Sequence, residues 1–178
     1  MIRGWRNLPE VHKYMFTDHQ ISPDEHDRWF RTVVNSPHNR YWIVVYDNED
    51  IGLANIYDVD ERNKRCYWGR YIAAPDLRGK GIGTYVEYWM LQYVFDMLQM
   101  NKLCTQVLAF NEVVLKMHKR FGFHQEGLLR EHIFKGGQPY DVVALAMLRN
   151  EWEEKKSELK EHVQHILELN KITADLSG

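Results

Sequence analysis

The pattern of apolar and polar positions along the chain predicts helices and strands in irregular alternation. Apolar residues repeat every three or four positions in some segments, which indicates helices, and runs rich in β-branched and aromatic residues indicate strands. The predicted helices cover Pro9 to Phe16, Ser22 to Val34, Gly83 to Met100, Glu112 to Arg120 and the segment from Trp152 onward. The predicted strands cover Tyr41 to Tyr46, Ile51 to Tyr57, Cys66 to Ala74, Leu103 to Ala109, Gln125 to Phe134 and Tyr140 to Leu148. This order favours an α/β (α+β) fold with a mixed, mostly antiparallel sheet flanked by helices.

Local signals support individual helices. Ser22, Pro23 and Glu25 form a capping box with proline in the first turn, so a helix is predicted to begin there. In the long helix after Gly83, one face is predicted to be buried and consists of Val86, Met90, Val94 and Met97. In the last helix, the predicted packing face consists of Trp152, Leu159, Val163 and Ile166.

The composition is that of an ordinary globular protein. The chain has 178 residues, of which 44% are hydrophobic and 27% charged, enough for a substantial core. We expect one main domain over residues 1–150, followed by a C-terminal amphipathic helix and tail over residues 151–178. The net charge of −2 gives no support for a nucleic-acid partner.

The cysteines and the apolar runs indicate the compartment. Cys66 and Cys104 both fall within predicted strands, so they are interpreted as buried thiols rather than as a disulfide. No signal peptide is visible after Met1, and no apolar run is long enough to span a bilayer. We therefore expect a cytoplasmic protein without a membrane partner.

The segment most suggestive of chemistry is Arg78-Gly79-Lys80-Gly81-Ile82-Gly83-Thr84, between a predicted strand and the long helix. Alternate glycines let the backbone turn sharply and approach a ligand, and the following helix N-terminus directs free N–H groups at it. This favours phosphate binding, although a flexible connection would have a similar composition. The spacing does not fit a P-loop, because Gly81 rather than Ser or Thr follows Lys80. It does not fit the dinucleotide fingerprint either.

Two motifs together are similar to the GNAT superfamily of acyl-CoA-dependent N-acetyltransferases. The first is Arg78-x-x-Gly81-x-Gly83, and the second is Asn111-x-x-Val114-x-x-x-His118-x-x-x-Gly122-Phe123. A narrower resemblance to the PseH family covers almost the whole chain. It rests on the run Trp5-Arg6-Asn7-Leu8-Pro9-Glu10-Val11, on Tyr14-Met15, Ile21-Ser22 and His26 with Trp29-Phe30, and on Tyr57-Asp58, Tyr71 and Glu126-Gly127.

The resemblance implies an enzyme with a single-domain GNAT fold that uses acetyl-CoA and no metal. The PseH family acetylates the 4-amino group of UDP-4-amino-4,6-dideoxy-N-acetyl-β-L-altrosamine on the way to pseudaminic acid, so the implied partner is a UDP-amino-sugar. Glu126-Gly127 and Asp141 are shared with ribosomal-protein N-terminal acetyltransferases. An RimJ/RimL-like protein N-terminal or other small-amine acetyltransferase therefore remains an alternative. An acyl-CoA-binding module without turnover is another.

Two departures from the family are plain. Members normally begin with a strand before the Trp-Arg-Asn segment, whereas only four residues precede Trp5 here. We therefore expect the first strand to be absent and a sheet edge to lack its partner, and a homodimer would be one way to protect it. The second departure is His118, which stands where the superfamily usually has tyrosine.

The resemblance also implies roles in donor binding and transfer. The amides of Arg78, Gly79, Lys80, Gly81, Ile82, Gly83 and Thr84 would hold the CoA pyrophosphate. Ile72 and Ala73 would pair with the pantetheine, where one amide would stabilise the thioester oxygen, and Asn111 would bond the pantetheine arm. The amine would attack the thioester directly, and His118 would protonate the leaving thiolate. The alternative for His118 is packing against the cofactor.

The implied acceptor site uses Arg6, His26, Tyr57, Asp58 and Tyr71. Arg6 would pair with the diphosphate in fork geometry. His26 would contact the phosphate or act as a base, and Tyr71 would line the sugar pocket beside the acyl group. A helix-surface histidine and a core aromatic are the alternatives for these two.

The pair His162 and His165 has a spacing that can hold a metal, but no third ligand accompanies it. A solvated helix face is the preferred interpretation, and no metal site is predicted.

Overall fold

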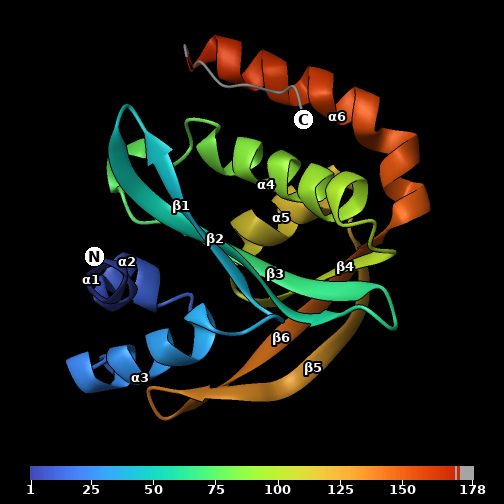
Figure 1. Ribbon diagram of the computed structural model, residues 1–178. Helices are drawn as coiled ribbons and strands as arrows, with labels where there is room; N and C mark the ends of the chain where they lie inside the picture. Colours follow the sequence, from blue (N-terminus) through green and yellow to red (C-terminus); the bar gives the residue numbers. More distant parts are fainter. Residues whose placement is uncertain (171, 173–178) are drawn as a thin grey trace.

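The computed structural model describes residues 1–170 and 172 and has one sheet with helices packed against both faces (Figure 1). The helices are α1 (Ile2–Asn7), α2 (Pro9–His12), α3 (Pro23–Val34), η1 (Pro75–Leu77), α4 (Ile82–Gln92), η2 (Tyr93–Met97), α5 (Glu112–Phe121) and α6 (Arg149–Leu169). The strands are β1 (Arg40–Tyr46), β2 (Glu49–Asp60), β3 (Arg65–Ile72), β4 (Lys102–Leu108), β5 (His124–Lys135) and β6 (Gln138–Leu148).

The sheet has the order β1-β2-β3-β4-β6-β5, and every neighbouring pair is antiparallel except β3 with β4. The predicted mixed, mostly antiparallel sheet is confirmed. In the described part of the chain no strand precedes β1, and residues before Arg40 form α1, α2 and α3. This agrees with the expected absence of a first strand, and β1 is one edge of the sheet.

The pairing of β3 with β4 is short, and its length determines where the sheet opens. The parallel register joins only Arg65 to Lys102, Cys66 to Leu103 and Tyr67 to Cys104. Beyond these residues the two strands have no paired positions, although β3 remains paired with β2 and β4 with β6. The sheet therefore opens between its two central strands toward their C-terminal ends.

Alternation along the strands produces one apolar cluster on each face. Residues such as Ile56 and Trp68 point toward α4, α5 and α6, whereas Leu53 and Tyr71 point toward α1 and α2. The last helix contributes to the larger cluster through Trp152, Leu159, Val163 and Leu167, which are all buried. Ile166 is only half-buried, so Leu167 takes the core position that the sequence assigned to Ile166.

The long predicted helix is α4 followed by a π-helical turn, η2. Val86, Met90 and Val94 are buried as predicted, but Met97 is 66% exposed. The π turn has a wider residue spacing than an α-helix, which rotates Met97 away from the core. The prediction for Met97 is therefore wrong for a physical reason that lies in the local backbone.

Two further boundaries differ from the prediction. The helix predicted from Pro9 to Phe16 ends at His12, and α1 precedes it. The strand predicted to end at Ala74 ends at Ile72, where the chain turns through η1. Among the described residues, no helix combines the length and apolar character needed to cross a bilayer.

The close approach of β2 to β3 requires glycine at position 52. A Cβ at Gly52 would lie 2.4 Å from the Tyr71 carbonyl oxygen and 3.2 Å from the Ile72 Cα. We predict that Gly52→Ala lowers the free energy of unfolding by about 1–3 kcal/mol, because the backbone must shift to accept the methyl group. Urea denaturation measures this. Gly127→Ala is the control, since nothing lies within 4 Å of its added Cβ, and an equal loss in both variants would contradict the prediction.

Candidate active site

A cleft of about 960 Å³ opens where β3 and β4 diverge. One end is formed by the N-terminal segment and α3, the middle by β2, β3 and β4, and the other end by the glycine-rich loop, the start of α5 and the end of α6. Of the predicted site residues, the structure brings these into the lining: Arg6, His26, Tyr57, Tyr71, Ile72, Arg78, Gly79, Gly81, Gly83, Thr84, Asn111 and His118.

The backbone of β3 presents alternate residues to the open gap. The Ala73 amide donates to the Ile51 carbonyl at 2.7 Å, so it belongs to the pairing with β2. Alternation in an antiparallel pair then directs the backbone groups of Ile72 and Arg70 away from β2, toward β4. The Trp68 carbonyl confirms this direction, since it accepts from the Thr105 hydroxyl on β4 at 3.3 Å. The predicted pairing of Ile72 and Ala73 with a ligand stays a prediction. The Ile72 amide faces the gap, whereas the Ala73 amide is already bonded to Ile51.

The Ile72 carbonyl already has a partner. Arg78 donates to it from Nε at 3.2 Å and from Nη2 at 3.0 Å. The guanidinium therefore closes the turn between β3 and the glycine-rich loop and lines the cleft at the same time.

The glycine-rich loop has the geometry of an anion site. Gly79 and Gly81 have φ of 78° and 90°, in the left-handed region that favours glycine. The first bond within α4 is from the Tyr85 amide to the Gly81 carbonyl at 2.9 Å. The amides of Ile82, Gly83 and Thr84 therefore have no acceptor inside the helix, and they lie at the positive end of its dipole.

Two residues of this loop do not line the cleft with their side chains. Lys80 is exposed and outside the lining, and Ile82 is 4% exposed within the core. Any contribution of Ile82 to anion binding is therefore through its backbone. The end of α6 packs on the loop, because a Cβ at Gly81 would lie 2.5 Å from the Ile166 Cγ2.

The wall formed by α5 carries Asn111 and His118. Asn111 is the N-cap of α5 and lines the cleft. His118 is 4% exposed, and its Nδ1 lies 2.7 Å from Glu87 Oε1 on α4. Glu87 is fully buried and its other oxygen lies 3.2 Å from Arg70 Nη2. Sequence reasoning missed Glu87, although a carboxylate among the apolar residues of α4 was a visible signal.

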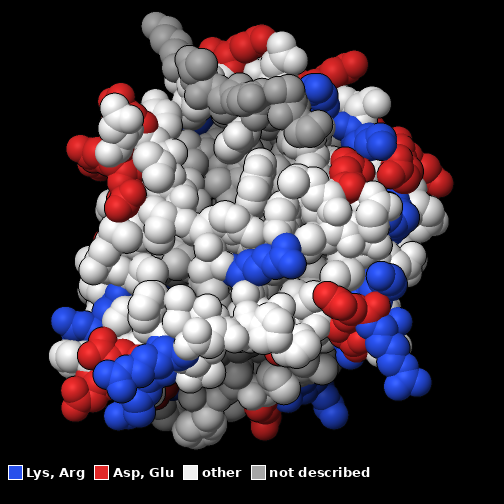
Figure 2. Space-filling model, in the orientation of Figure 1, with Lys and Arg blue, Asp and Glu red and all other residues white. Residues whose placement is uncertain are grey.

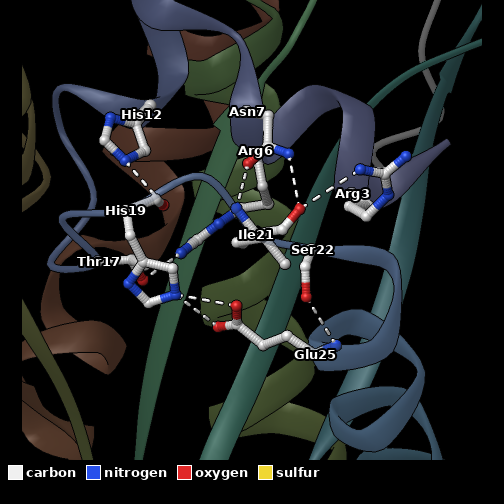
Figure 3. Close-up of polar contacts among 9 residues, drawn as sticks. All are labelled: Arg3, Arg6, Asn7, His12, Thr17, His19, Ile21, Ser22 and Glu25. Atoms are coloured by element: carbon white, nitrogen blue, oxygen red, sulfur yellow. Dashed lines mark hydrogen bonds and ion pairs between the residues drawn. The ribbon is translucent and has the colours of Figure 1, made fainter.

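The N-terminal segment forms the opposite wall and is tied together by polar contacts (Figure 3). Arg6 donates to the Thr17 hydroxyl at 3.0 Å and contacts Met15 Sδ at 2.7 Å. Asn7 clips the segment to Ile21, accepting from its amide at 2.8 Å and donating to its carbonyl at 3.0 Å. The two neighbouring residues therefore have different roles. Arg6 faces the cleft, and Asn7 fixes the loop around Ile21.

The tip of the β5–β6 hairpin also binds the N-terminal segment. Lys135 is 9% exposed, and its ammonium donates to the carbonyls of His12, Met15 and Thr17 at 2.7, 2.8 and 3.1 Å. The neighbouring Gly136 amide donates to Asp18 at 2.9 Å. Burial lowers the pKa of Lys135 from its ordinary value, and Asp18 opposes that shift.

Aromatic side chains line the cleft between the two walls. Burial raises the pKa of Tyr71 to about 12, so its phenol stays protonated near neutral pH, and its oxygen has no hydrogen-bond partner among the described residues. Tyr57 stacks on Tyr67 with a centroid distance of 5.5 Å, and burial raises its pKa to about 12 as well. The ring centroids of His26 and Trp29 lie 5.2 Å apart.

Asp58 is the predicted acceptor residue that the structure places elsewhere. It is exposed, lies outside the cleft lining and has φ of 50° at an irregularity of β2. Successive side chains in a strand face opposite sides, so Asp58 does not share the side of Tyr57, and the irregularity begins directly after Tyr57. Asp58 is therefore not among the residues that line the cleft, and its role in the acceptor site stays a prediction.

Cationic side chains outnumber carboxylates in the lining of the cleft. Among its lining residues are five with cationic side chains (Arg6, Lys13, Arg70, Arg78 and Arg120) and two carboxylates (Glu10 and Glu25). Figure 2 shows charges of both signs around the margin of one face of the molecule, and a centre that is uncharged except for one cationic side chain. Among the described residues, no group of three or more His, Cys, Asp or Glu side chains is placed to hold a metal.

Comparison with known proteins agrees with this geometry. The family described as Acetyltransferase (GNAT) domain matches residues 1–124. The SPbeta prophage-derived uncharacterized N-acetyltransferase YokL of Bacillus subtilis is 32% identical over 126 residues, 70% of each chain. The acetyltransferase PseH of Campylobacter jejuni is 31% identical over 123 residues, 69% of this chain and 74% of PseH.

A solved structure shows the likeness in fold. The spermidine N-acetyltransferase from Vibrio cholerae, in complex with CoA and spermine, matches with a TM-score of 0.79 at 23% identity. The match covers 85% of this chain and 90% of that one.

The anchoring of the N-terminal wall predicts a large effect of Lys135→Met. The substitution removes a charged donor from three carbonyls, so we expect the free energy of unfolding to fall by about 2–3 kcal/mol. Lys116→Met is the control, since that side chain is 75% exposed and, among the described residues, its ammonium pairs only with Glu112. We expect it to change stability by less than about 0.5 kcal/mol. Chemical denaturation giving the same value for both variants would refute the anchoring role.

Proposed function

The chain belongs to the GNAT family of N-acetyltransferases, and we propose that it acetylates the 4-amino group of a UDP-linked 4-amino-4,6-dideoxy sugar in pseudaminic acid biosynthesis. The acetyl donor is acetyl-CoA. The observation that carries the acceptor assignment is Arg6, a partly buried cation that lines the acceptor end of the cleft and has no carboxylate in ion-pair contact among the described residues.

The donor end of the cleft fits a CoA thioester. The amides of Ile82, Gly83 and Thr84, which have no acceptor within α4, suit the pyrophosphate. The Ile72 amide faces the gap between β3 and β4, where an extended pantetheine arm takes the place of a strand. Asn111 lines the same gap and offers an amide side chain to that arm.

The electrostatics of Arg6 favour an anionic acceptor. Burial lowers the pKa of its guanidinium from the ordinary value, and Tyr71, Tyr41 and Glu25 oppose that shift. A charged group in such surroundings gains most from an opposite charge that reaches it, and a guanidinium fork matches a diphosphate. A polyamine would instead meet Arg6 and Lys13, with Glu10 and the His19-bound Glu25 as the carboxylates of the lining. The numbers of cations and carboxylates at this end are equal, so the support for a nucleotide sugar over spermidine comes from the Arg6 guanidinium, which has no carboxylate in ion-pair contact among the described residues.

The aromatic residues complete an acceptor pocket for a sugar and a base. Tyr71 offers a protonated hydroxyl without a protein partner, and Tyr57 and Trp29 offer ring faces. Because the pKa of Tyr71 is about 12, its role is that of a hydrogen-bond donor to the acceptor rather than that of a base. His26 lies on the same wall, with its ring tilted against that of Trp29, and lines this end of the cleft.

The transfer is direct. The acceptor nitrogen forms a bond to the acetyl carbon while the carbon–sulfur bond breaks, the amine loses a proton and the departing sulfur gains one. The Ile72 amide stabilises the negative charge that develops on the acetyl oxygen. His118 supplies the proton to sulfur, since an imidazolium is a stronger acid than a thiol. Positioning of the two reactants in one cleft accounts for much of the acceleration.

An acceptor panel tests the proposal. Thiol release from acetyl-CoA is measured with the UDP-4-amino-sugar, spermidine and a peptide with a free N-terminus in parallel. We expect kcat/KM for the nucleotide sugar to exceed the other two by ~100-fold or more, as a site with charged groups for one substrate discriminates strongly. A preference for the peptide or for spermidine would contradict the acceptor assignment. Tight CoA binding without transfer to any amine would contradict turnover itself.

Arg6→Ala separates the two ends of the cleft. We predict that it raises KM for the nucleotide sugar about tenfold or more, because a charged hydrogen bond contributes about 1.5–3 kcal/mol. The KM for acetyl-CoA should stay within about threefold. Arg3→Ala is the matched control, since Arg3 donates to the Ile21 carbonyl at 3.4 Å and lies outside the cleft lining. The reverse pattern, with acetyl-CoA affected more, would place Arg6 outside the acceptor site.

His118→Phe tests the proton donor. The ring shape is retained and the exchangeable proton is lost, so we expect kcat to fall by ~100-fold. Steady-state kinetics at saturating substrates give this value. The exposed His124 provides the control, because it lies outside the cleft and its removal should leave kcat unchanged. A loss of less than about threefold for His118→Phe would show that the ring only packs.

A further inference from the structure

A buried chain of polar contacts runs behind His118, on the side away from the cleft. Arg70 Nη2 lies 3.2 Å from Glu87 Oε2, and Glu87 Oε1 lies 2.7 Å from His118 Nδ1. The exposed fractions of these side chains are 11% for Arg70, 0% for Glu87 and 4% for His118. The three residues come from β3, α4 and α5, the three elements that surround the donor end of the cleft.

This arrangement adds little to stability compared with apolar side chains of similar volume. A buried carboxylate must be compensated, and each oxygen of Glu87 has one partner, Arg70 or His118. The neighbours of Glu87 on α4, including Val86 and Met90, belong to the apolar core. The main consequence of the network is therefore the orientation of His118.

The ring of His118 is fixed in one orientation. Trp68 packs against it edge-on at 5.6 Å, and Phe123 lies at 5.1 Å. Nδ1 is directed at Glu87, while Nε2 has no hydrogen-bond partner among the described residues, and the residue lines the cleft. A carboxylate is an acceptor only, so Nδ1 must carry a proton and the neutral ring has its lone pair on Nε2.

The network also reaches the glycine-rich loop. A Cβ at Gly83 would lie 3.3 Å from Arg70 Nη1 and 3.4 Å from its Cζ, so the absence of a side chain leaves room for the guanidinium. The third glycine of the loop motif has no positive φ, unlike Gly79 and Gly81. Gly83 therefore leaves space for the Arg70 guanidinium beside the start of α4.

We propose that Glu87 and Arg70 are positioning residues that hold His118 as the Nδ1–H tautomer, with Nε2 directed at the reacting atoms. This rests on the proposed function, in which His118 takes part in proton transfer. The lone pair of Nε2 accepts the proton that the amine loses, and the resulting imidazolium is balanced by the Glu87 carboxylate. Nε2 then donates that proton to the departing sulfur, and the ring returns to its neutral form. One histidine thus serves both proton transfers of the reaction.

Few charged groups surround the His118 ring. Glu87 from α4 contacts it and Arg70 from β3 acts through Glu87, whereas Trp68 and Phe123 are uncharged. Its own helix adds Lys119 and Arg120, which are exposed. Glu87 is therefore the charged group whose removal is expected to affect the ring most.

The tautomer is tested on the folded wild-type protein without turnover. Nitrogen-15 shifts of the His118 ring are recorded above the pH at which it titrates. The proposal requires a protonated Nδ1 and an unprotonated Nε2. A ring protonated at Nε2, or an equal mixture of the two tautomers, would overturn it. This measurement needs no substrate, so its outcome does not depend on the proposed function. Failure of the proposed function would instead appear as absence of acetyl transfer by the wild-type enzyme.

Glu87→Gln tests the consequence for catalysis. We expect kcat to fall at least tenfold while KM for acetyl-CoA stays within threefold. The acidic limb of the kcat–pH profile should move to lower pH, because the variant lacks the negative charge that favours a protonated ring. Glu112→Gln makes the same change at a carboxylate that is 71% exposed on α5 and should alter neither. In a His118→Phe background, Glu87→Gln should cost less than twofold further. An unchanged pH profile, or a full additional loss in that background, would overturn the proposal.

Discussion

The early separation of β3 from β4 is the constraint on which the rest of the site depends. Three paired positions join these strands, and beyond them the Ile72 and Arg70 backbone groups face a gap rather than a partner strand. Buried backbone groups need hydrogen-bond partners, so such a gap suits an extended ligand. The strands also lead directly to the donor-side elements: β3 runs into the glycine-rich loop, and β4 runs into α5.

The acceptor side is built differently, by a segment that has little regular structure of its own. Residues between α2 and α3 are held by side chains from elsewhere in the chain, with Asn7 fixing Ile21 and Lys135 donating to three carbonyls. This leaves Arg6 directed into the cleft without a carboxylate partner in the described part of the chain. The donor end thus offers backbone amides, and the acceptor end offers a cationic side chain and aromatic rings.

Features set by local sequence were predictable, and features set by distant contacts were not. The strands, the Ser22 N-cap and the glycine-rich loop follow from short-range patterns, and the structure has all of them. The Glu25 carboxylate contacts His19 on the preceding loop instead of completing the predicted capping box. Met97 was misplaced because a π turn shifts the side-chain period of the helix. Glu87 and Lys135 were missed because their partners lie 31 and more than 100 residues away.

The most direct test of this account is amide hydrogen exchange at Arg70 and Ile72 with and without CoA. If the gap between β3 and β4 receives the pantetheine arm, saturating CoA should slow exchange at the Ile72 amide at least tenfold. The Ala73 amide, already bonded to Ile51, should change much less. Equal exchange at Ile72 in free and CoA-saturated protein would contradict the account, because the ligand would then bind without using the opened sheet.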